Sequence, residues 1–204
     1  MPSGWPSRHP FFASTCHLGL TVLLHSKNHR RTENWPYWVD DKMKVIYSKH
    51  YNINLGLLNY LHPFDGTKFQ TIHDGLKNND HIEFIGPSEP ASMEIIDEFL
   101  SSIMRHRVRD KNGIFQALEV PRLPFISFSF LDRKILTPMR WAVAGTILGA
   151  TQALKDGGIY WNVSGGYHHA MQQNMEGSCI YNGIGIAVAV MGVGINDQNF
   201  VIGL

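Results

Sequence analysis

Two adjacent histidines, His168 and His169, are the side chains of this sequence best suited to proton transfer. They follow a predicted buried strand over residues 159–163, and ligands of open α/β sheets bind beyond the carboxyl ends of such strands. Gly165 and Gly166 precede them and let the backbone turn sharply and approach a ligand. One imidazole can take a proton from water while the other stays protonated and supports developing negative charge. The pattern favours an acid–base site, with a merely solvated loop as the alternative.

The metal-binding potential of the pair alone is low, because adjacent side chains point to opposite sides of an extended chain. Further along, Gly177-Ser178-Cys179 places another glycine beside a thiol. A second cluster, His62-Pro63-Phe64-Asp65, stands just before a predicted helix over residues 65–77. Asp65 is expected to be the N-cap of that helix, and His62 to pack or hydrogen-bond near the floor of the site.

The elements that must position these residues alternate along the chain. Short apolar runs predict strands, and apolar residues at helical spacing predict helices. Ser92 is expected to cap a helix that reaches Ile103, and Thr137-Pro138 to begin a helix that ends near Lys155. The predicted strands are 45–48, 81–86, 159–163 and 200–204, and the other predicted helices are 65–77 and 184–193. This order predicts an α/β fold with a parallel sheet covered on both faces.

Composition limits the classes of partner. The chain has 204 residues and a formal net charge of +1, which argues against direct nucleic-acid binding. No Lys or Arg follows Lys155, and twelve of the nineteen glycines fall at or after Gly145, so the C-terminal part resembles the middle of a core. The apolar run 179–195 is too short to span a membrane and is expected to be a buried helix. Two cysteines make no disulfide framework, so an intracellular location is expected, with cytoplasm and nucleus both open.

The first 42 residues differ from the rest of the chain. They contain Trp5, Trp35 and Trp38 without a helical or strand period. We expect residues 1–42 to be a poorly ordered N-terminal extension, and the domain to begin at Met43. A genuine arm of the protein remains the alternative.

Several motifs of residues 43–204 together resemble the class IV branch of the histone deacetylase family. The N-terminal motifs are Tyr47-Ser48, Tyr51-Asn52-Ile53 and His62-Pro63-Phe64-Asp65. The later ones are Val120-Pro121, Arg133 to Arg140, Gly145-Thr146-Ile147, Gly165-Gly166-Tyr167-His168-His169-Ala170 and Gly177-Ser178-Cys179. The resemblance implies a three-layer arginase/deacetylase-type α/β fold. It also implies hydrolysis of acyl-lysine, or of a related small acylated amine, by a zinc-activated water.

The resemblance also assigns roles to single residues. His168 would support the oxyanion and the leaving group, and His169 would be the general base. Gly177 would line the acyl tunnel through its backbone, with Tyr167 and Ser178 as the other substrate-binding residues. The expected neighbours of the site are Cys179, Gly165, Gly166, His62 and Asp65.

Two of the departures from the family pattern bear on the acyl tunnel and on catalysis. Ser178 stands where the family usually has a tunnel-wall phenylalanine. The family's zinc ligands, two Asp and one His, begin in a strand end, and Phe200 to Leu204 resembles only the start of that strand. Asp197 is the one carboxylate nearby, whereas a catalytic zinc needs three protein ligands. The sequence therefore predicts a truncated deacetylase domain that binds no zinc alone and has little turnover.

Two functions remain open for such a chain, besides the third possibility of an unrelated α/β domain in which the His168–His169 pair is incidental. The first is a zinc-dependent amide hydrolase of which these residues form the N-terminal part. The second is a non-catalytic, deacetylase-like binding or interaction module. The oligomeric state and the preferred acyl group are not readable from the sequence.

Overall fold

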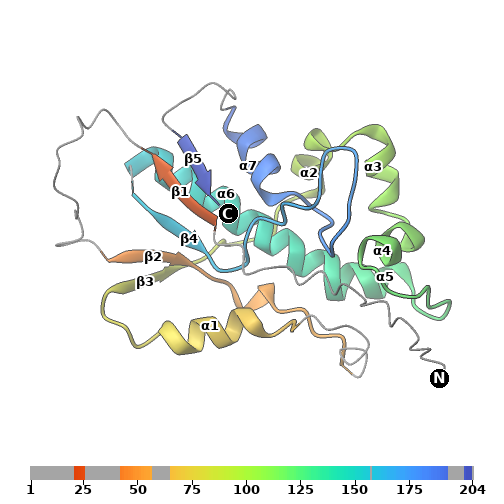
Figure 1. Cartoon of the computed structure of the whole chain (residues 1–204), viewed down its shortest axis with the longest axis horizontal. Coiled ribbons are helices and arrows are strands. Elements are labelled where there is room, and N and C mark those ends of the chain that lie inside the picture. Colours follow the sequence, from red (N-terminus) through yellow and green to blue (C-terminus); the bar gives the residue numbers. More distant parts are fainter. Residues whose placement is uncertain (1–20, 26–41, 57–64, 157, 193–199, 204) are drawn as a thin grey trace, which may run out of the picture.

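The computed structural model describes residues 21–25, 42–56, 65–156, 158–192 and 200–203. Within them one mixed sheet has the strand order β3-β2-β4-β1-β5 (Figure 1). The strands are β1 (Thr21–His25), β2 (Met43–Ile46), β3 (Ile82–Ile85), β4 (Tyr160–Asn162) and β5 (Phe200–Gly203).

Three of these strands form the expected parallel part of the sheet. β2 pairs in parallel with β3 on one side and with β4 on the other. Their carboxyl ends, at Ile46, Ile85 and Asn162, therefore meet at one edge, and the histidine loop leaves from this edge. The α/β class predicted from the sequence is confirmed.

The other half of the sheet is antiparallel. β1 pairs with β4 and with β5 in antiparallel register, so β5 runs in the same direction as β4 with β1 between them. β1 comes from the segment that the sequence assigned to an extension outside the domain. The other residues before Lys42 lie outside the described part of the chain, and the domain boundary at Met43 stays a prediction.

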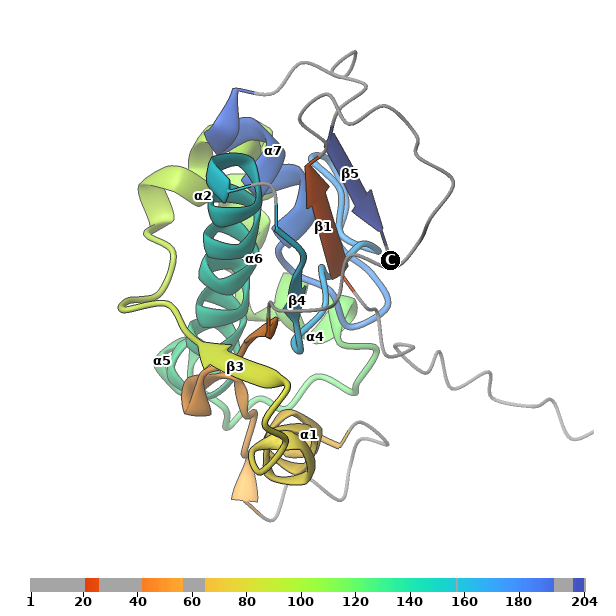
Figure 2. The same cartoon turned by 90° about the vertical axis from the view of Figure 1, so that its left-hand side faces the viewer.

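The helices gather mainly around one long central helix. The α-helices are α1 (Lys68–Leu76), α2 (Met93–Phe99), α3 (Ser102–Arg107), α4 (Lys111–Ala117), α5 (Phe128–Leu131), α6 (Thr137–Asp156) and α7 (Gly183–Met191). A 3-10 turn, Lys49–Tyr51, follows β2. Seen from the side, α6 packs along one face of the sheet with α2 and α7 beside it (Figure 2). The largest fully buried side chains include Tyr51, Tyr160 and Tyr181, so the core is aromatic as well as aliphatic.

The helix expected to start at Thr137 starts earlier. A π-helical turn, Asp132–Leu136, joins α5 directly to α6, and the Thr137 N–H bonds the Asp132 carbonyl. Thr137 is therefore not an N-cap, and its hydroxyl instead accepts a hydrogen bond from Arg140 at 2.8 Å. Ser127 is the N-cap, because its hydroxyl accepts from Phe130 N at 3.2 Å. The π turn lets the helix pass Pro138, which has no N–H to donate.

The helix expected from Ser92 to Ile103 is broken. Ser92 caps α2 as predicted, through a hydrogen bond from Ile95 N. Leu100 is extended, with φ −77° and ψ 141°, and the Ser101 hydroxyl then caps α3 by accepting from Met104 N. Ile103, expected on the apolar face, is consequently 70% exposed. No helix of the described residues is long and apolar enough to cross a membrane.

Candidate active site

The candidate site begins where β4 ends at Asn162. This side chain is fully buried, and its amide donates to the Ala142 carbonyl at 3.1 Å and to Thr146 Oγ1 at 3.0 Å. Both acceptors belong to α6. The end of the strand is therefore fixed to the central helix immediately before the loop.

The loop then turns through two left-handed residues. Gly165 has φ 71° and Tyr167 has φ 51°. Glycine adopts this conformation without steric cost, but tyrosine is strained in it, and such strain persists only where the surroundings impose it. Gly165 N bonds the Asn162 carbonyl, and Gly183 N bonds the Gly166 carbonyl at 2.9 Å. Both ends of the turn are therefore held by backbone hydrogen bonds.

The two histidine rings lie together rather than on opposite sides of the chain. Their centroids are 4.1 Å apart and their planes are tilted by 38°. The expectation of divergent side chains was wrong, because the segment is not extended. Tyr167 is left-handed, and Ala170 N bonds the Tyr167 carbonyl at 3.2 Å, closing a turn around the pair. The sequence missed this turn because a left-handed tyrosine has no propensity signature.

The electrostatic surroundings of His168 disfavour its protonated form. Burial lowers the pKa of His168 below its usual value, and the neighbouring His169 lowers it further. A positive charge on His169 thus disfavours protonation of His168. Near neutral pH His168 is mainly uncharged, so it can accept a proton or donate one N–H hydrogen bond.

A second tight turn packs against the pair. Gly177 and Ser178 have φ 57° and 61°, and Cys179 N bonds the Glu176 carbonyl at 2.9 Å. Two central residues with positive φ are typical of a type I′ turn. A Cβ on Gly177 would lie 3.1 Å from Cγ of His169, so the bare backbone contacts the ring. Sequence reasoning placed this glycine at the site, and the structure brings it against His169.

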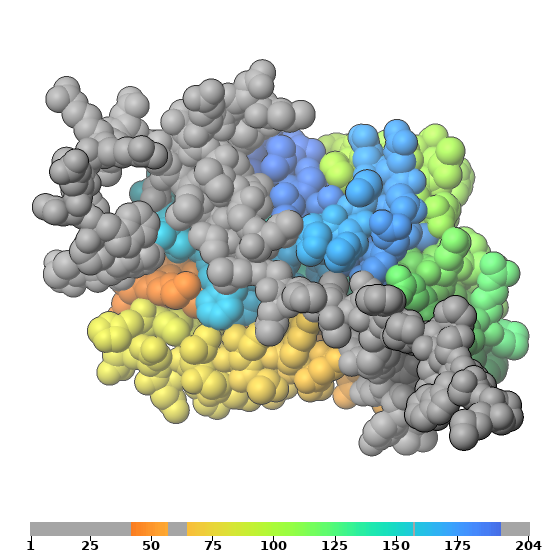
Figure 3. All heavy atoms as spheres, viewed as in Figure 1, coloured from red at the N-terminus to blue at the C-terminus, as the bar shows by residue number. Residues whose placement is uncertain are grey.

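The turn is fixed from the opposite side by α4. Ser178 N bonds the Ala117 carbonyl at 2.9 Å, and Cys179 is fully buried. On the face shown in Figure 3, the light-blue histidine segment lies beside the green helical segment of α3 to α5. The hydrogen bond from Ser101 N to the Gln172 carbonyl, at 3.0 Å, joins these two segments.

One residue that sequence reasoning missed is Asn182. Its Nδ2 donates to the Ala170 carbonyl and its Oδ1 accepts from Gly185 N, both at 2.7 Å. It is the N-cap of α7. An asparagine directly before an apolar run is a usual N-cap signal and could have identified its capping role.

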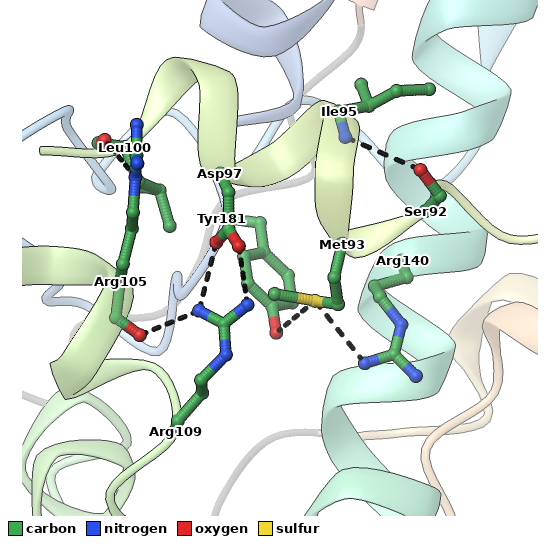
Figure 4. A network of polar contacts seen from close by, with 9 residues as sticks. All are labelled: Ser92, Met93, Ile95, Asp97, Leu100, Arg105, Arg109, Arg140 and Tyr181. Atoms are coloured by element: carbon green, nitrogen blue, oxygen red, sulfur yellow. Dashed lines mark hydrogen bonds and ion pairs between the residues drawn. The ribbon is translucent and has the colours of Figure 1, made fainter. Parts of the chain in front are cut away.

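The chain around Tyr181 is tied to α2 by polar contacts (Figure 4). The Tyr181 hydroxyl donates to the Met93 sulfur at 3.9 Å, and Arg140 donates to the same sulfur at 3.7 Å. Arg109 forms a two-pronged ion pair with Asp97 at 2.6 and 2.9 Å. Burial raises the pKa of Tyr181 to about 12, so its hydroxyl stays protonated as a donor.

The cluster near residue 65 is only partly described. His62 lies outside the described residues. Asp65 is not the N-cap of α1, since that position is taken by Thr67. Asp65 instead accepts hydrogen bonds from Thr67 N at 2.8 Å and Thr67 Oγ1 at 2.7 Å, which form a local turn before the helix. These bonds hold the pKa of Asp65 below its usual value.

A catalytic zinc would need three protein ligands. Among the residues with described positions, no three His, Cys, Asp or Glu side chains are grouped so as to hold a metal ion. His168, His169 and Cys179 thus do not form such a set with a carboxylate, and Asp197 lies outside the described residues. The described residues do not fit a zinc site by themselves.

Comparison with known proteins identifies the family of the region that contains the histidine loop. The sequence model of the histone deacetylase domain matches residues 62–200, more than half of the chain. Histone deacetylase 2 of Arabidopsis thaliana is 28% identical over 149 residues, which cover 72% of this chain and 38% of that relative. The chain thus spans well under half the length of that relative. The matched region includes both histidines, the Gly177-Ser178 turn and α7, and the chain belongs to the histone deacetylase family.

Proposed function

We propose that this chain carries the proton-transfer part of an acyl-lysine amide hydrolase. The observation that carries the proposal is the His168–His169 pair, with centroids 4.1 Å apart, directly beyond the carboxyl end of a parallel strand. Family membership supports the substrate class, since acetylated-lysine proteins are the substrates that the family implies.

The two histidines have different roles in this proposal. His169 contacts the Gly177 backbone and takes the proton from the attacking water as general base. His168, whose pKa is lowered, is uncharged at rest and supports the developing oxyanion through an N–H hydrogen bond. The departing lysine amine then receives the proton held on His169.

Substrate would approach along the turn that faces the pair. Gly177, Ser178 and Tyr167 are the proposed substrate-binding residues, and Gly165, Gly166 and Cys179 shape the wall behind them. Ser178 offers a small side chain where the family usually places a phenylalanine, which supports a wider tunnel.

Zinc dependence is general in this family. Bound zinc would polarise the acyl carbonyl and activate water. The described residues include the two histidines proposed for proton transfer but no group of three side chains that could hold zinc. We therefore propose that this chain alone binds zinc weakly. Calorimetric titration of the purified chain with zinc checks this, and stoichiometric high-affinity binding would contradict it.

The test of the proposed function is hydrolysis of an acetyl-lysine peptide, measured with added zinc on this chain and on the longest natural chain that contains it. In whichever chain turns over, H169Q should lower kcat by about 10²–10⁴-fold, the usual contribution of a general base. H50Q is the matched control, because His50 stacks on Trp141 at 4.4 Å and is outside the proposed site. Retention of full kcat by H169Q would refute the assignment.

The alternative function is a binding module without catalysis. Peptide binding by both chains, with an acetyl-lysine preference and without turnover at any zinc concentration, would support that alternative. It would at the same time contradict the hydrolase proposal.

A further inference from the structure

The amide of Asn182 makes two hydrogen bonds to two different parts of the chain. Its Oδ1 accepts from Gly185 N in the first turn of α7, and its Nδ2 donates to the Ala170 carbonyl. Both distances are 2.7 Å, which is short for a neutral N–H···O bond. Ala170 directly follows His169 and is fully buried.

Capping alone does not account for an asparagine at this position. An N-cap needs only an acceptor, so Ser, Thr or Asp would cap α7 about as well. Among these residues only the amide has its donor on a different atom from its acceptor, so it can cap the helix through Oδ1 while Nδ2 satisfies a buried carbonyl that would otherwise be costly. The donor half of Asn182 therefore serves the histidine loop rather than the helix.

The next residue holds the other side of the same loop. Gly183 N donates to the Gly166 carbonyl at 2.9 Å. Residues 166 and 170 thus bracket the histidines, and both are bonded to the two consecutive residues that begin α7. A Cβ on Gly183 would lie 3.3 Å from the Gly166 oxygen, so the two segments are closely packed here.

We propose that Asn182 is a positioning residue that fixes the His168–His169 pair relative to α7. It acts through the Ala170 carbonyl and does not contact the rings or a substrate. The proposal rests on the proposed function for its catalytic meaning. The geometry itself can be tested without turnover, so failure of one does not imply failure of the other.

The test separates the two halves of the amide. N182D and N182S both keep an acceptor for the helix and remove the amide donor. Histidine ring signals are measured by ¹H–¹³C and ¹H–¹⁵N NMR on the full chain, together with the melting temperature. S92A is the matched control, because it removes a cap from α2 and leaves the histidine loop bonded.

Two remote histidines report on the rest of the fold. His50 stacks on Trp141, and His73 stacks on Tyr47 at 4.3 Å. In N182D and N182S, the His168 and His169 signals should shift or broaden and the pKa of His168 should change, while the His50 and His73 signals stay in place. In S92A, all four signals should stay in place.

Three results would overturn the proposal. The first is unchanged His168 and His169 signals in both folded variants. The second is an equal change in all four histidines, which would indicate general destabilisation. The third is a wild-type spectrum in which the four histidines have the signals of an unfolded chain, because the bracketed loop would then not exist. In a catalytically active parent chain, loss of the donor should lower kcat more than it raises KM.

Discussion

At the scale of single residues, Gly145 shows how closely the core is packed beneath the histidine loop. It lies within α6, and a Cβ there would collide with the Tyr51 hydroxyl and lie 3.1 Å from Asn162 Nδ2. Tyr51 is fully buried, and its hydroxyl has no hydrogen-bond partner among the described residues. Burial raises the pKa of Tyr51, and Tyr167 raises it further.

Replacing Gly145 by Ala should therefore lower the free energy of unfolding by about 1–3 kcal/mol, the usual cost of overpacking. Y51F should restore most of this loss, because it removes the colliding oxygen. Y51F alone should be neutral or stabilising, since the hydroxyl is buried without a described partner. Urea unfolding of the four proteins gives the coupling energy.

Gly75, in α1, is the control for the effect of replacing a glycine within a helix when no collision results. A Cβ there would meet nothing within 4 Å. G75A should raise stability by about 0.5–1 kcal/mol, because alanine is the better helix former. If the effects of G145A and Y51F on the free energy of unfolding were additive, the proposed collision between a Cβ at position 145 and the Tyr51 hydroxyl would be wrong.

His168 gives a pH prediction of determined sign. Its pKa is lowered in the folded state, so the unfolded chain takes up its proton first as pH falls. The stability that this residue contributes is complete above the unfolded value, about 6.5. This contribution to stability is lost as the pH falls below the unfolded pKa and through the lower pKa of the folded state. H169Q should raise the pKa of His168 without restoring it fully, because burial remains. An NMR titration in which H169Q left the pKa of His168 unchanged would argue against an electrostatic effect of His169 on His168.

At the scale of elements, three polar side chains connect α6 to the sheet. Lys44 of β2 donates to Asp156 at 3.1 Å and to Tyr160 at 3.0 Å, and Tyr160 of β4 donates to Asp156 at 2.5 Å. The hydrogen bonds to Tyr160 and Asp156 raise the pKa of Lys44. Burial alone would raise the pKa of Asp156, but bonds from Tyr160, Gly158 and Lys44 outweigh it and lower this pKa.

Y160F should lower the free energy of unfolding by about 1 kcal/mol, the usual net contribution of a hydrogen bond to stability. Asp156 stabilises the fold above its unfolded pKa, near 4, and this stability is lost as pH falls through the lowered folded value. Lys44 stabilises the fold below its unfolded pKa, near 10.5, and loses this contribution as pH rises through the raised folded value. The mutant should therefore differ least from wild type at the acid extreme. Denaturant melts from pH 2 to 11 measure this.

The Lys77–Asp74 pair is the control for this connection. It joins two residues of one helical segment at 3.0 Å, and both side chains are nearly half exposed. K77M should leave stability within experimental error, since exposed pairs contribute little. An equal loss of stability in K77M and Y160F would show that the bonds between the sheet and α6 stabilise the fold no more than an exposed ion pair does.

Features that depend on residues close together in sequence could be predicted, whereas features that depend on contacts between distant residues could not. The loop after β4, the Ser92 cap and α7 depend on neighbouring residues and are readable from pattern. The closeness of His168 and His169 was missed, because it depends on a strained tyrosine held by long-range bonds. The π turn before Thr137 was also missed, because Thr137-Pro138 is a strong local start signal. Competition from Arg140 for the Thr137 hydroxyl cannot be seen in sequence.

At the scale of the whole molecule, β1 joins the two halves of the sheet. It is the common neighbour of β4 and β5, so these two strands have no described pairing with each other. An N-terminal segment whose composition differs from the rest of the chain thus supplies an interior strand of the sheet. The sequence could not predict this, because an antiparallel insertion of five residues has no distinctive pattern.

Deletion of residues 1–42 should therefore lower the melting temperature and broaden the transition, because β4 and β5 lose their shared partner. Deletion of residues 1–20 keeps β1 and is the matched control. Circular dichroism and calorimetry of the two shortened chains measure the contribution of the strand. Identical melting of both would mean that β1 does not stabilise the sheet.

The pairing of β1 with β5 also has a kinetic consequence. It joins residues 21–25 to residues 200–203, so 174 residues lie between the two strands in sequence. Contacts of such high contact order form slowly, since a long loop must close first. During synthesis, β1 would remain without this partner until β5, more than 170 residues later in the chain, has been made. Over that interval its exposed edge would be open to chaperones and to the β1 strands of other nascent chains.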